Sequence, residues 1–275
     1  MARPCRMLAW GAGAVLVVYV ALCALLYLQQ RRLIYYPQFT RVNAAQTDFA
    51  LARQDVVLRG WVVNPGRRDA LLYFGGNAES VEGNREAFTR ALPSHTVYLV
   101  AYRGYGASDG EPTETHLLAD ALALHDDIAK RHAGGHVAVA GRSLGSGVAT
   151  FVAAERRVPT LVLVTPFDSL AAVAQAHYPM FPVGLLLRDR YDSAARLPRH
   201  QGRLLVLRAG QDQVVPPAHT DRLLKALGRP AQVVEFPRGW PRRPVARPGL
   251  LVGHRRFPGD GRRLSAPAIP LLPRQ

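Results

Sequence analysis

One segment, residues 136 to 155, constrains the fold of this 275-residue chain more than any other. An apolar run from His136 to Ala140 leads into Gly141-Arg142-Ser143-Leu144-Gly145, and the stretch from Leu144 to Ala154 has the composition of a helix. Glycines on either side of Ser143 permit a strained turn and a close approach of helix to strand. The segment therefore predicts a strand, a tight turn with Ser143 at its tip, and a helix. An ordinary Gly/Ser-rich turn is the alternative.

Short β-branched runs alternate with longer helical stretches along the middle of the chain, which is typical of an α/β fold with a mostly parallel sheet and helices on both faces. Strands are expected at Val56 to Val63, Ala70 to Phe74, Thr96 to Tyr102, His136 to Ala140, Thr160 to Thr165, Arg203 to Ala209 and Gln232 to Phe236. Helices are expected near Ala78 to Leu92, Glu114 to His132, Leu144 to Ala154, Leu170 to His177 and Pro217 to Leu227.

An uncharged apolar run from Leu8 to Leu28 precedes this region. About 20 helical residues, rising about 1.5 Å each, cross the ~30 Å hydrocarbon core of a bilayer. We therefore expect a single-pass membrane helix whose partner is the lipid bilayer. A cleaved signal peptide is the alternative, although Ala21-Leu22-Cys23-Ala24 is a poor cleavage site. Arginines flank both ends of the run, so the positive-inside rule does not set its orientation.

The net charge of +15 is unevenly distributed. Residues 238 to 275 hold nine arginines and a single acidic residue, Asp260, so about half of the excess charge lies in this tail. We therefore expect no nucleic-acid partner for the α/β body. An anion-binding module that uses the basic tail is the rival interpretation.

Asp212 is the expected partner acid of Ser143. A serine hydroxyl needs a base to become nucleophilic, and in folds with this turn the acid and the histidine follow the serine in that order. Asp212 follows the expected strand Arg203 to Ala209, where an acid that orients a histidine should lie. A helix N-cap ahead of Pro217 is the alternative role. Asp168 is the rival acid, although it could instead cap the helix near Leu170.

Two backbone amides are expected to stabilise the oxyanion of an acyl-transfer reaction. One belongs to Leu144, the residue after the nucleophile, and the other to Asn77 in Phe74-Gly75-Gly76-Asn77-Ala78. For the second segment, a plain strand-to-helix turn is the alternative. This chemistry implies no metal and no organic cofactor.

Residues 32 to 237 resemble the small membrane-anchored α/β-hydrolase-domain proteins. The family hallmarks appear as Ala101-Tyr102-Arg103-Gly104-Tyr105-Gly106-Ala107-Ser108-Asp109-Gly110, Gly141 to Gly145, Pro166-Phe167-Asp168-Ser169-Leu170 and Asp212-Gln213-Val214-Val215-Pro216. The resemblance implies an α/β-hydrolase fold and a serine hydrolase that cleaves an ester, thioester or amide through an acyl-enzyme. The family's His-Gly-Asn-Ala stretch reads Gly75-Gly76-Asn77-Ala78 here, which keeps the backbone donors.

Three parts follow from the resemblance: an anchor with its flank (1–36), a hydrolase domain (37–237) and a Pro/Arg-rich irregular tail (238–275). The substrate is expected to be a small molecule or an acyl or peptide compound. The stretch between Phe167 and Arg203 is expected to form a small apolar lid.

The catalytic histidine departs from the family pattern. The family places it in a loop after the last strand, where this chain reads Pro237-Arg238-Gly239-Trp240-Pro241. His219 lies close to Asp212 in sequence and is expected to face outward from its helix. His254 is the remaining downstream candidate, within the Pro/Arg tail. A catalytically crippled relative is therefore an alternative interpretation.

A frame slip near codon 238 would explain this departure. Trp240 has the single codon TGG and Pro241 begins with C, so reading one base later forces a glycine at position 240 and permits a histidine at position 241. The sequence therefore predicts that the tail is frame-shifted, either naturally or through a sequencing error.

Overall fold

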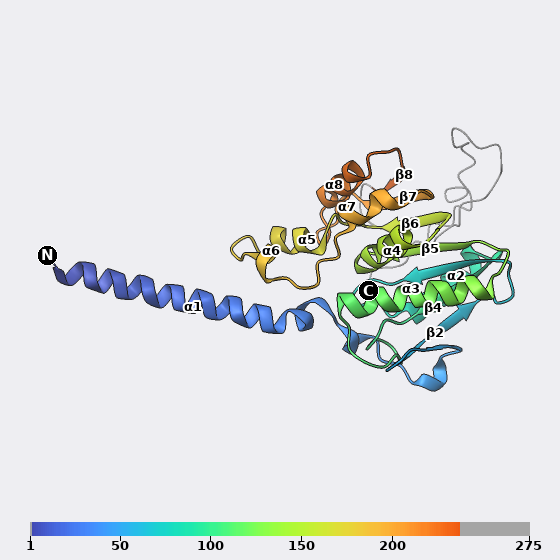
Figure 1. The fold of residues 1–275 in the computed structure, drawn as a ribbon, viewed down its shortest axis with the longest axis horizontal. Helices are drawn as coiled ribbons and strands as arrows, with labels where there is room; N and C mark the ends of the chain where they lie inside the picture. Colours follow the sequence, from blue (N-terminus) through green and yellow to red (C-terminus); the bar gives the residue numbers. More distant parts are fainter. Residues whose placement is uncertain (1, 237–275) are drawn as a thin grey trace.

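An eight-stranded sheet forms the centre of the described chain (Figure 1). The computed structural model describes residues 2–236, with side chains described from Trp10 onward. The strand order is β1-β2-β4-β3-β5-β6-β7-β8. β1 and β2 are antiparallel additions at one edge, and the other six strands run parallel. The strands are β1 (Phe49–Ala52), β2 (Val57–Val63), β3 (Asp69–Phe74), β4 (His95–Val100), β5 (Val137–Arg142), β6 (Thr160–Val164), β7 (Arg203–Ala209) and β8 (Gln232–Phe236).

Helices cover both faces of this sheet (Figure 1). One hydrophobic cluster packs α3, α4 and α8 against one face, and a second includes Phe88 of α2 on the other face. The helices are α1 (Ala2–Ile34), α2 (Arg85–Ala91), α3 (Glu114–Arg131), α4 (Leu144–Glu155), α5 (Leu170–His177), α6 (Val183–Leu186), α7 (Ser193–Arg196) and α8 (Pro217–Leu227). The predicted α/β-hydrolase architecture is confirmed.

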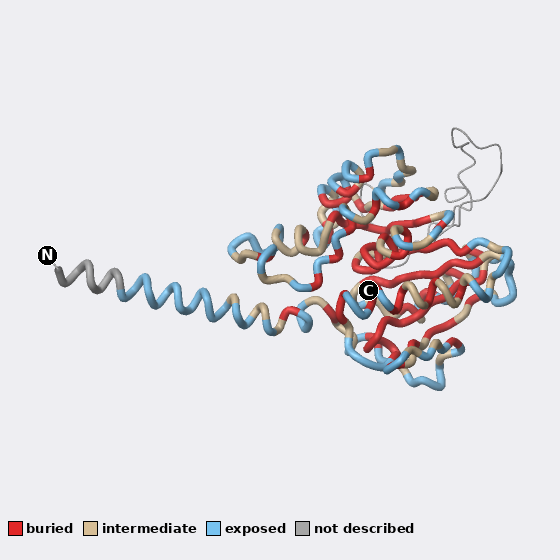
Figure 2. The backbone as a smooth tube through the Cα atoms, in the orientation of Figure 1, coloured by how far each residue is buried: buried red, intermediate tan, exposed pale blue. Residues whose placement is uncertain are grey.

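β3 illustrates how the sequence builds the two layers. Successive side chains of a strand point to opposite faces, and in β3 Leu71 and Tyr73 join one cluster while Leu72 and Phe74 join the other. All four residues are buried, and the strands at the centre of the sheet are coloured as buried in Figure 2. The strand therefore reads as a continuous apolar run rather than as an alternating one, as expected for a central parallel strand.

Seven predicted strands are present with small shifts at their ends, whereas β1 was missed because four residues give too short a pattern. The helix expected near Ala78 to Leu92 was partly wrong. A 3₁₀ turn, Val81–Asn84, precedes α2, and residues before it are held out of helical geometry. The Glu79 carboxylate accepts hydrogen bonds from the Gly76 amide (2.6 Å) and the Asn84 side chain (2.6 Å), so this loop has its own stable structure.

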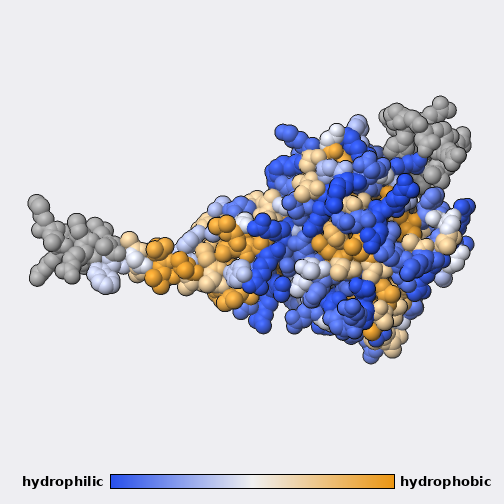
Figure 3. Space-filling view, in the orientation of Figure 1, coloured by the Kyte–Doolittle hydropathy of each residue, from blue (hydrophilic) through white to orange (hydrophobic). Residues whose placement is uncertain are grey.

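α1 projects from the body as a long helix whose described side chains are mostly exposed (Figures 1 and 2). It holds an 18-residue window with a mean hydropathy of 2.3, so by length and composition it could span a membrane. In Figure 3 the apolar surface follows α1 toward the body. Its last turns are no longer isolated, because Gln30 is buried against the segment that contains α6.

Candidate active site

Ser143 lies at a strained turn between β5 and α4. Its backbone has φ 49° and ψ −118°, a left-handed φ that a non-glycine residue rarely adopts. The glycines on either side make this turn possible. A Cβ at Gly141 would lie 2.1 Å from the Gly145 carbonyl oxygen, and a Cβ at Gly145 would lie 2.2 Å from the Phe74 carbonyl oxygen. The predicted strand-turn-helix is therefore present, and it requires glycine at both positions.

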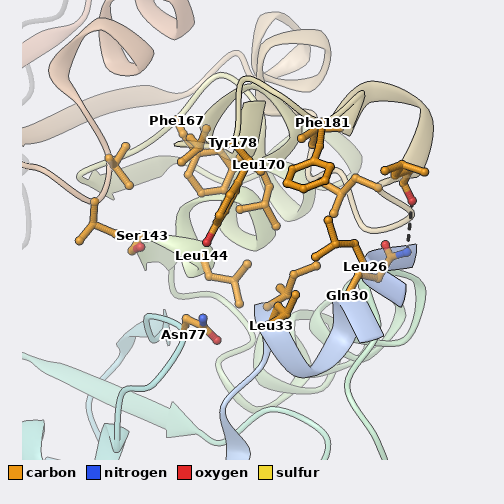
Figure 4. Close-up of a pocket in the computed structure, with 18 residues that line it drawn as sticks. Leu26, Gln30, Leu33, Asn77, Ser143, Leu144, Phe167, Leu170, Tyr178 and Phe181 are labelled. Carbon is orange, nitrogen blue, oxygen red and sulfur yellow. Dashed lines mark hydrogen bonds between the residues drawn. The ribbon is translucent and has the colours of Figure 1, made fainter. Parts of the chain in front are cut away.

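Hydrogen bonds hold the turn in place from two sides. The Ser143 amide donates to the Val164 carbonyl (2.9 Å) in β6, and the Ser146 hydroxyl donates to the Ser143 carbonyl (2.6 Å). Strain of this kind persists only where the surrounding structure enforces it, and it is common at functional sites. The Ser143 side chain is left to face a cavity (Figure 4).

The cavity has a volume of about 500 Å³, within the range typical of small-molecule sites. Ser143, Leu144 and Asn77 line one end, and the rest is lined mostly by apolar side chains, with Gln30 of α1 among them (Figure 4). No charged side chain is among the described residues that line it. The lining residues are Leu26, Gln30, Leu33, Ile34, Asn77, Ser143, Leu144, Phe167, Leu170, Val173, Ala174, Tyr178, Phe181, Val183, Leu186, Leu187, Val214 and Val215.

The two expected oxyanion donors lie at the Ser143 end of this cavity. Within the part of the chain that the structure describes, neither the Asn77 amide nor the Leu144 amide has a hydrogen-bond partner. Unpaired amides beside a nucleophile are suited to bind a developing oxyanion. The structure thus brings Ser143, Leu144 and Asn77 together as the sequence predicted.

Glu79 fixes the loop that carries Asn77, a role that the sequence analysis missed. Its buried carboxylate accepts from Tyr73 (2.8 Å), Gly76 (2.6 Å) and Asn84 (2.6 Å), and lies 3.7 Å from the Arg142 guanidinium. Arg142 directly precedes Ser143, so one carboxylate links both loops at this end of the cavity. The signal in the sequence was an acidic residue three positions after Gly75-Gly76.

Two tyrosines of the Ala101 to Gly110 segment support the same loop. The Tyr102 hydroxyl donates to the Gly75 carbonyl (2.8 Å), and the Tyr105 hydroxyl donates to Asn77 Oδ1 (3.1 Å). Burial raises the pKa of Tyr102 well above its usual value, so this hydroxyl keeps its proton. The segment therefore acts on the candidate site through the Asn77 loop.

Asp212 lies in the loop after β7, but no described histidine contacts it. Its Oδ1 accepts from the amides of Val214 (2.9 Å) and Val215 (3.0 Å), and both of these valines line the cavity. The capping alternative is wrong, because the residue that precedes α8 is Pro216 and no side chain caps this helix. The Asp212 loop thus borders the same cavity as Ser143, with its carboxylate held in its own turn.

His219 corrects the expectation that it faces outward. It is only 2% exposed, and its Nδ1 lies 2.7 Å from Asp168 Oδ1. Arg222 donates to the other Asp168 oxygen (2.5 Å). Burial raises the pKa of Asp168, but the hydrogen bonds from Arg222 and His219 outweigh it, and the pKa is lowered overall.

The capping role considered for Asp168 is also wrong, since Ser169 caps α5 by accepting from the Ala172 amide. Asp168 instead links the loop after β6 to α8 through His219 and Arg222. Of the three residues, none lines the cavity that Ser143 faces. Sequence reasoning missed this pairing because the partners lie 51 and 54 positions apart.

No described histidine lines the cavity. His177 is the nearest in sequence to the lining residues, and its Nε2 contacts the Val214 carbonyl (3.0 Å). His254 and the whole predicted tail, residues 238 to 275, lie outside the described residues. Among residues 10–236, no group of three or more His, Cys, Asp or Glu side chains is placed to hold a metal ion.

Comparisons with known proteins identify the family to which this chain belongs. Residues 69–194 match the model of the α/β-hydrolase fold. An uncharacterized protein of Mycobacterium tuberculosis is 36% identical over 225 residues, which cover 76% of this chain and 79% of that protein. The lysophosphatidylserine lipase ABHD12 of Rattus norvegicus is 32% identical over 183 residues, covering 59% of this chain but only 46% of the lipase.

Solved structures agree on the fold. Est1E from Butyrivibrio proteoclasticus, with ferulic acid bound, superposes with a TM-score of 0.56 at 17% identity, covering 68% of this chain and 88% of Est1E. The mouse α/β-hydrolase domain-containing protein 10 gives a TM-score of 0.56 at 19% identity, covering 70% and 89%. The chain belongs to the α/β-hydrolase family.

Proposed function

We propose that this chain is a membrane-tethered serine hydrolase that cleaves an ester, thioester or amide bond next to an apolar acyl group. The observation that carries the proposal is the position of Ser143. Its hydroxyl faces an apolar cavity from a strained turn, beside two amides that have no partner among the described residues. This combination suits nucleophilic attack on a carbonyl carbon, because donors are already aimed at the oxygen that becomes charged.

In the proposed reaction, Ser143 Oγ forms a bond to the carbonyl carbon while a base accepts the hydroxyl proton. The carbonyl oxygen becomes an oxyanion, which the Leu144 and Asn77 amides bind. Collapse expels the alcohol, thiol or amine, which takes up the proton, and leaves an acyl group on Ser143. Water then attacks this ester by the same route and restores the serine. The reaction requires no redox partner.

The apolar wall supports an acyl group as the part of the substrate that enters the cavity. Charged side chains are absent from the described lining residues, so a charged headgroup would gain little by entering. The ABHD12 relatives are named lysophosphatidylserine lipases, which favours a lipid ester over a peptide as the substrate.

The base is proposed to be a histidine oriented by Asp212, as in the family's order of Ser, acid and His. The described residues bring no histidine to Ser143, and this observation favours a crippled relative as the second candidate. The frame slip near codon 238 would explain why the described residues bring no histidine to Ser143, since the restored frame permits a histidine at position 241, after β8. His254 is the candidate base in the chain as written.

We further propose that α1 anchors the chain through residues 8 to 28. The chain would then consist of an anchor with its flank (1–36), a hydrolase domain (37–237) and a tail (238–275). The length and apolar composition of α1 support the anchor. A cleaved product that begins near Gln29 would contradict it.

The test compares the chain as written with a frame-restored chain, encoded after deletion of one base near codon 238. Each is assayed on p-nitrophenyl esters of increasing acyl length. We expect turnover in the frame-restored chain, its loss in Ser143→Ala, and little turnover in the chain as written. Ordinary turnover by the chain as written that His254→Ala abolishes would instead make His254 the base. Inactivity of both chains on every ester would favour the crippled relative.

A further inference from the structure

α1 and the lid form two facing walls of the candidate site. Leu26, Gln30 and Leu33 of α1 line the cavity opposite Leu170 and Phe181 (Figure 4). The lid is defined here as residues 170–187, which include α5 and α6. A helix that served only as an anchor would not need to contribute side chains to the cavity.

The lid is bonded to α1 over several helical turns. Gln30 donates to the Leu186 carbonyl (3.2 Å) and accepts from the Arg188 amide (2.7 Å). Farther along α1, Tyr19 donates to the Met180 carbonyl (2.9 Å), and its ring stacks on Phe181 with centroids 6.0 Å apart. These contacts place residues 178–185, called the lid tip below, beside residues of the Leu8 to Leu28 run. If that run spans a membrane, the lid tip lies at a depth within the bilayer.

The depth follows from the helix rise. Tyr19 and Leu28 are nine residues apart in the sequence. At about 1.5 Å per residue, Tyr19 lies roughly 13 Å below Leu28 along α1. If α1 spans the membrane with Leu28 near its surface, the lid tip that touches Tyr19 lies close to the middle of the ~30 Å hydrocarbon core.

The backbone of the lid tip is suited to that environment. Irregular chain is unstable in hydrocarbon unless its polar groups are paired. Gln175 provides much of this pairing, since its side chain donates to the Phe181 carbonyl (3.1 Å) and accepts from the Val183 amide (3.1 Å). Tyr19 and Gln30 of α1 pair with the carbonyls of Met180 and Leu186, as described above. Pro179 and Pro182 have no amide hydrogen to satisfy.

The outer surface of the lid is apolar, and a basic rim follows it. Tyr178, Met180 and Leu185 are exposed, Leu185 by 84%. In Figure 3 the apolar surface of α1 continues toward the segment that carries the lid. Four exposed arginines lie just past these apolar stretches in the sequence, where a span ends at the lipid headgroups: Arg31, Arg32, Arg188 and Arg190.

We propose that the lid tip enters the bilayer together with α1, so that the cavity opens toward the hydrocarbon and takes the acyl chain of a membrane lipid directly from it. α1 is then a wall of the acyl site as well as an anchor. This proposal rests on the proposed function for its chemistry, but its geometry is independent of catalysis. It names the substrate class as a bilayer lipid whose headgroup stays at the arginine rim.

The first arm of the test measures the depth of the lid. The full chain, with Cys5 and Cys23 replaced by Ser, carries a single NBD-labelled cysteine in phosphatidylcholine vesicles that contain nitroxide-labelled lipid. Leu185→Cys should show blue-shifted emission and strong quenching. Phe39→Cys is the matched control, because it is a similarly exposed apolar residue (69%) beyond the end of α1, and it should remain unquenched. Equal, weak quenching at both positions would overturn the proposal.

The second arm of the test identifies the molecule that enters the cavity. The full chain with Ser143→Ala is reconstituted with phosphatidylcholine that carries a diazirine at the end of one acyl chain, and is then illuminated. Peptides that contain Leu144 or Phe167, at the deep end of the cavity, should be labelled. Leu26→Trp, which fills space at the wall, should reduce this label, whereas Leu25→Trp on the exposed side of α1 should not.

The outcomes separate this inference from the proposed function. Label confined to α1 and the lid, with none at the deep peptides, would overturn the inference. So would deep labelling only by a diazirine fatty acid delivered on albumin, because the chain would then arrive from water. Deep labelling of the Ser143→Ala chain by the lipid, together with an unreactive Ser143 in the frame-restored chain, would reject the hydrolase proposal alone.

Discussion

The loops after β5 and β7 reach the same cavity, but they are held very differently. The Ser143 turn has a left-handed backbone, flanking glycines packed against backbone atoms, and hydrogen bonds from both sides. The Asp212 side chain accepts from the amides of Val214 and Val215, and the loop is otherwise held by single bonds to Ala209, Phe236 and His177. The Ser143 turn is fully formed by described residues. Under the proposed function, Asp212 would also need a histidine partner, and the described residues do not provide one.

The difference shows which parts of an active site the fold itself can build. The Ser143 turn and the proposed oxyanion site are made mainly of backbone from β3, β5, α4 and the loops between them, with support from Val164 of β6 and from the Glu79 and Tyr105 side chains. An acid and its base are side chains from separate loops, and their partnership depends on the segment after the last strand. A chain can therefore keep a well-formed nucleophile turn while the base is lost.

The largest expected effect is the fall in kcat when Asp212 is replaced in a chain that contains the proposed base. In the frame-restored chain, Asp212→Asn should lower kcat about ten-thousandfold, because the acid sets the tautomer of the histidine. Steady-state ester hydrolysis measures this, with circular dichroism to show that folding is retained. If Asp168→Asn reduces kcat instead and Asp212→Asn does not, the acid has been assigned wrongly.

The Ser143 turn should be most sensitive to added bulk. Gly145→Ala places a methyl group against the Phe74 carbonyl and should lower the free energy of unfolding by about 3 kcal/mol. Gly83→Ala is the matched control, since no atom lies within 4 Å of its new methyl group. Urea denaturation of the two variants checks this, and equal stabilities would show that the turn is not tightly packed.

The contacts among Asp168, His219 and Arg222 should affect the free energy of unfolding and not the rate of ester hydrolysis. Asp168→Asn should cost about 2 kcal/mol of unfolding free energy near neutral pH, because it removes hydrogen bonds from Arg222 and His219 to a charged acceptor. The pKa of Asp168 is lowered in the folded state, so its stabilising contribution is present above the unfolded pKa. It is lost as the pH falls through the lower, folded value.

The stability gap between wild type and Asp168→Asn should therefore narrow as the pH is lowered from 6 toward 3. Urea denaturation of both chains across that range tests the sign. A gap that widens toward low pH would contradict the lowered pKa.

Substitution of Glu79 should give the smallest of these effects, a modest fall in kcat. Glu79→Gln keeps the shape of the side chain but turns an amide donor toward the Gly76 amide, so the Asn77 loop should shift. We expect kcat to fall about tenfold with little change in KM, less than for loss of an oxyanion donor itself. Glu86→Gln, an exposed helix residue nearby, is the control. A change in KM alone would indicate that Glu79 acts on substrate binding and not on the oxyanion site.

Local patterns in the sequence predicted much of this fold. Glycine spacing around Ser143 and the β-branched runs gave the turn and seven strands, because each is decided by neighbouring residues. The Asp168 pairing with His219 and the contact between Tyr19 and the lid were not predictable in this way. Their partners lie 51 and 161 positions apart, so only the folded topology brings them together.

The most direct test of the central claim is the site of fluorophosphonate labelling. The frame-restored chain is treated with the reagent, and the adduct is located by mass spectrometry of its peptides. We expect a single adduct on Ser143, lost in Ser143→Ala, and much slower labelling of the chain as written. An adduct that survives Ser143→Ala, or that maps to another serine such as Ser146, would contradict the assignment of Ser143 as the nucleophile.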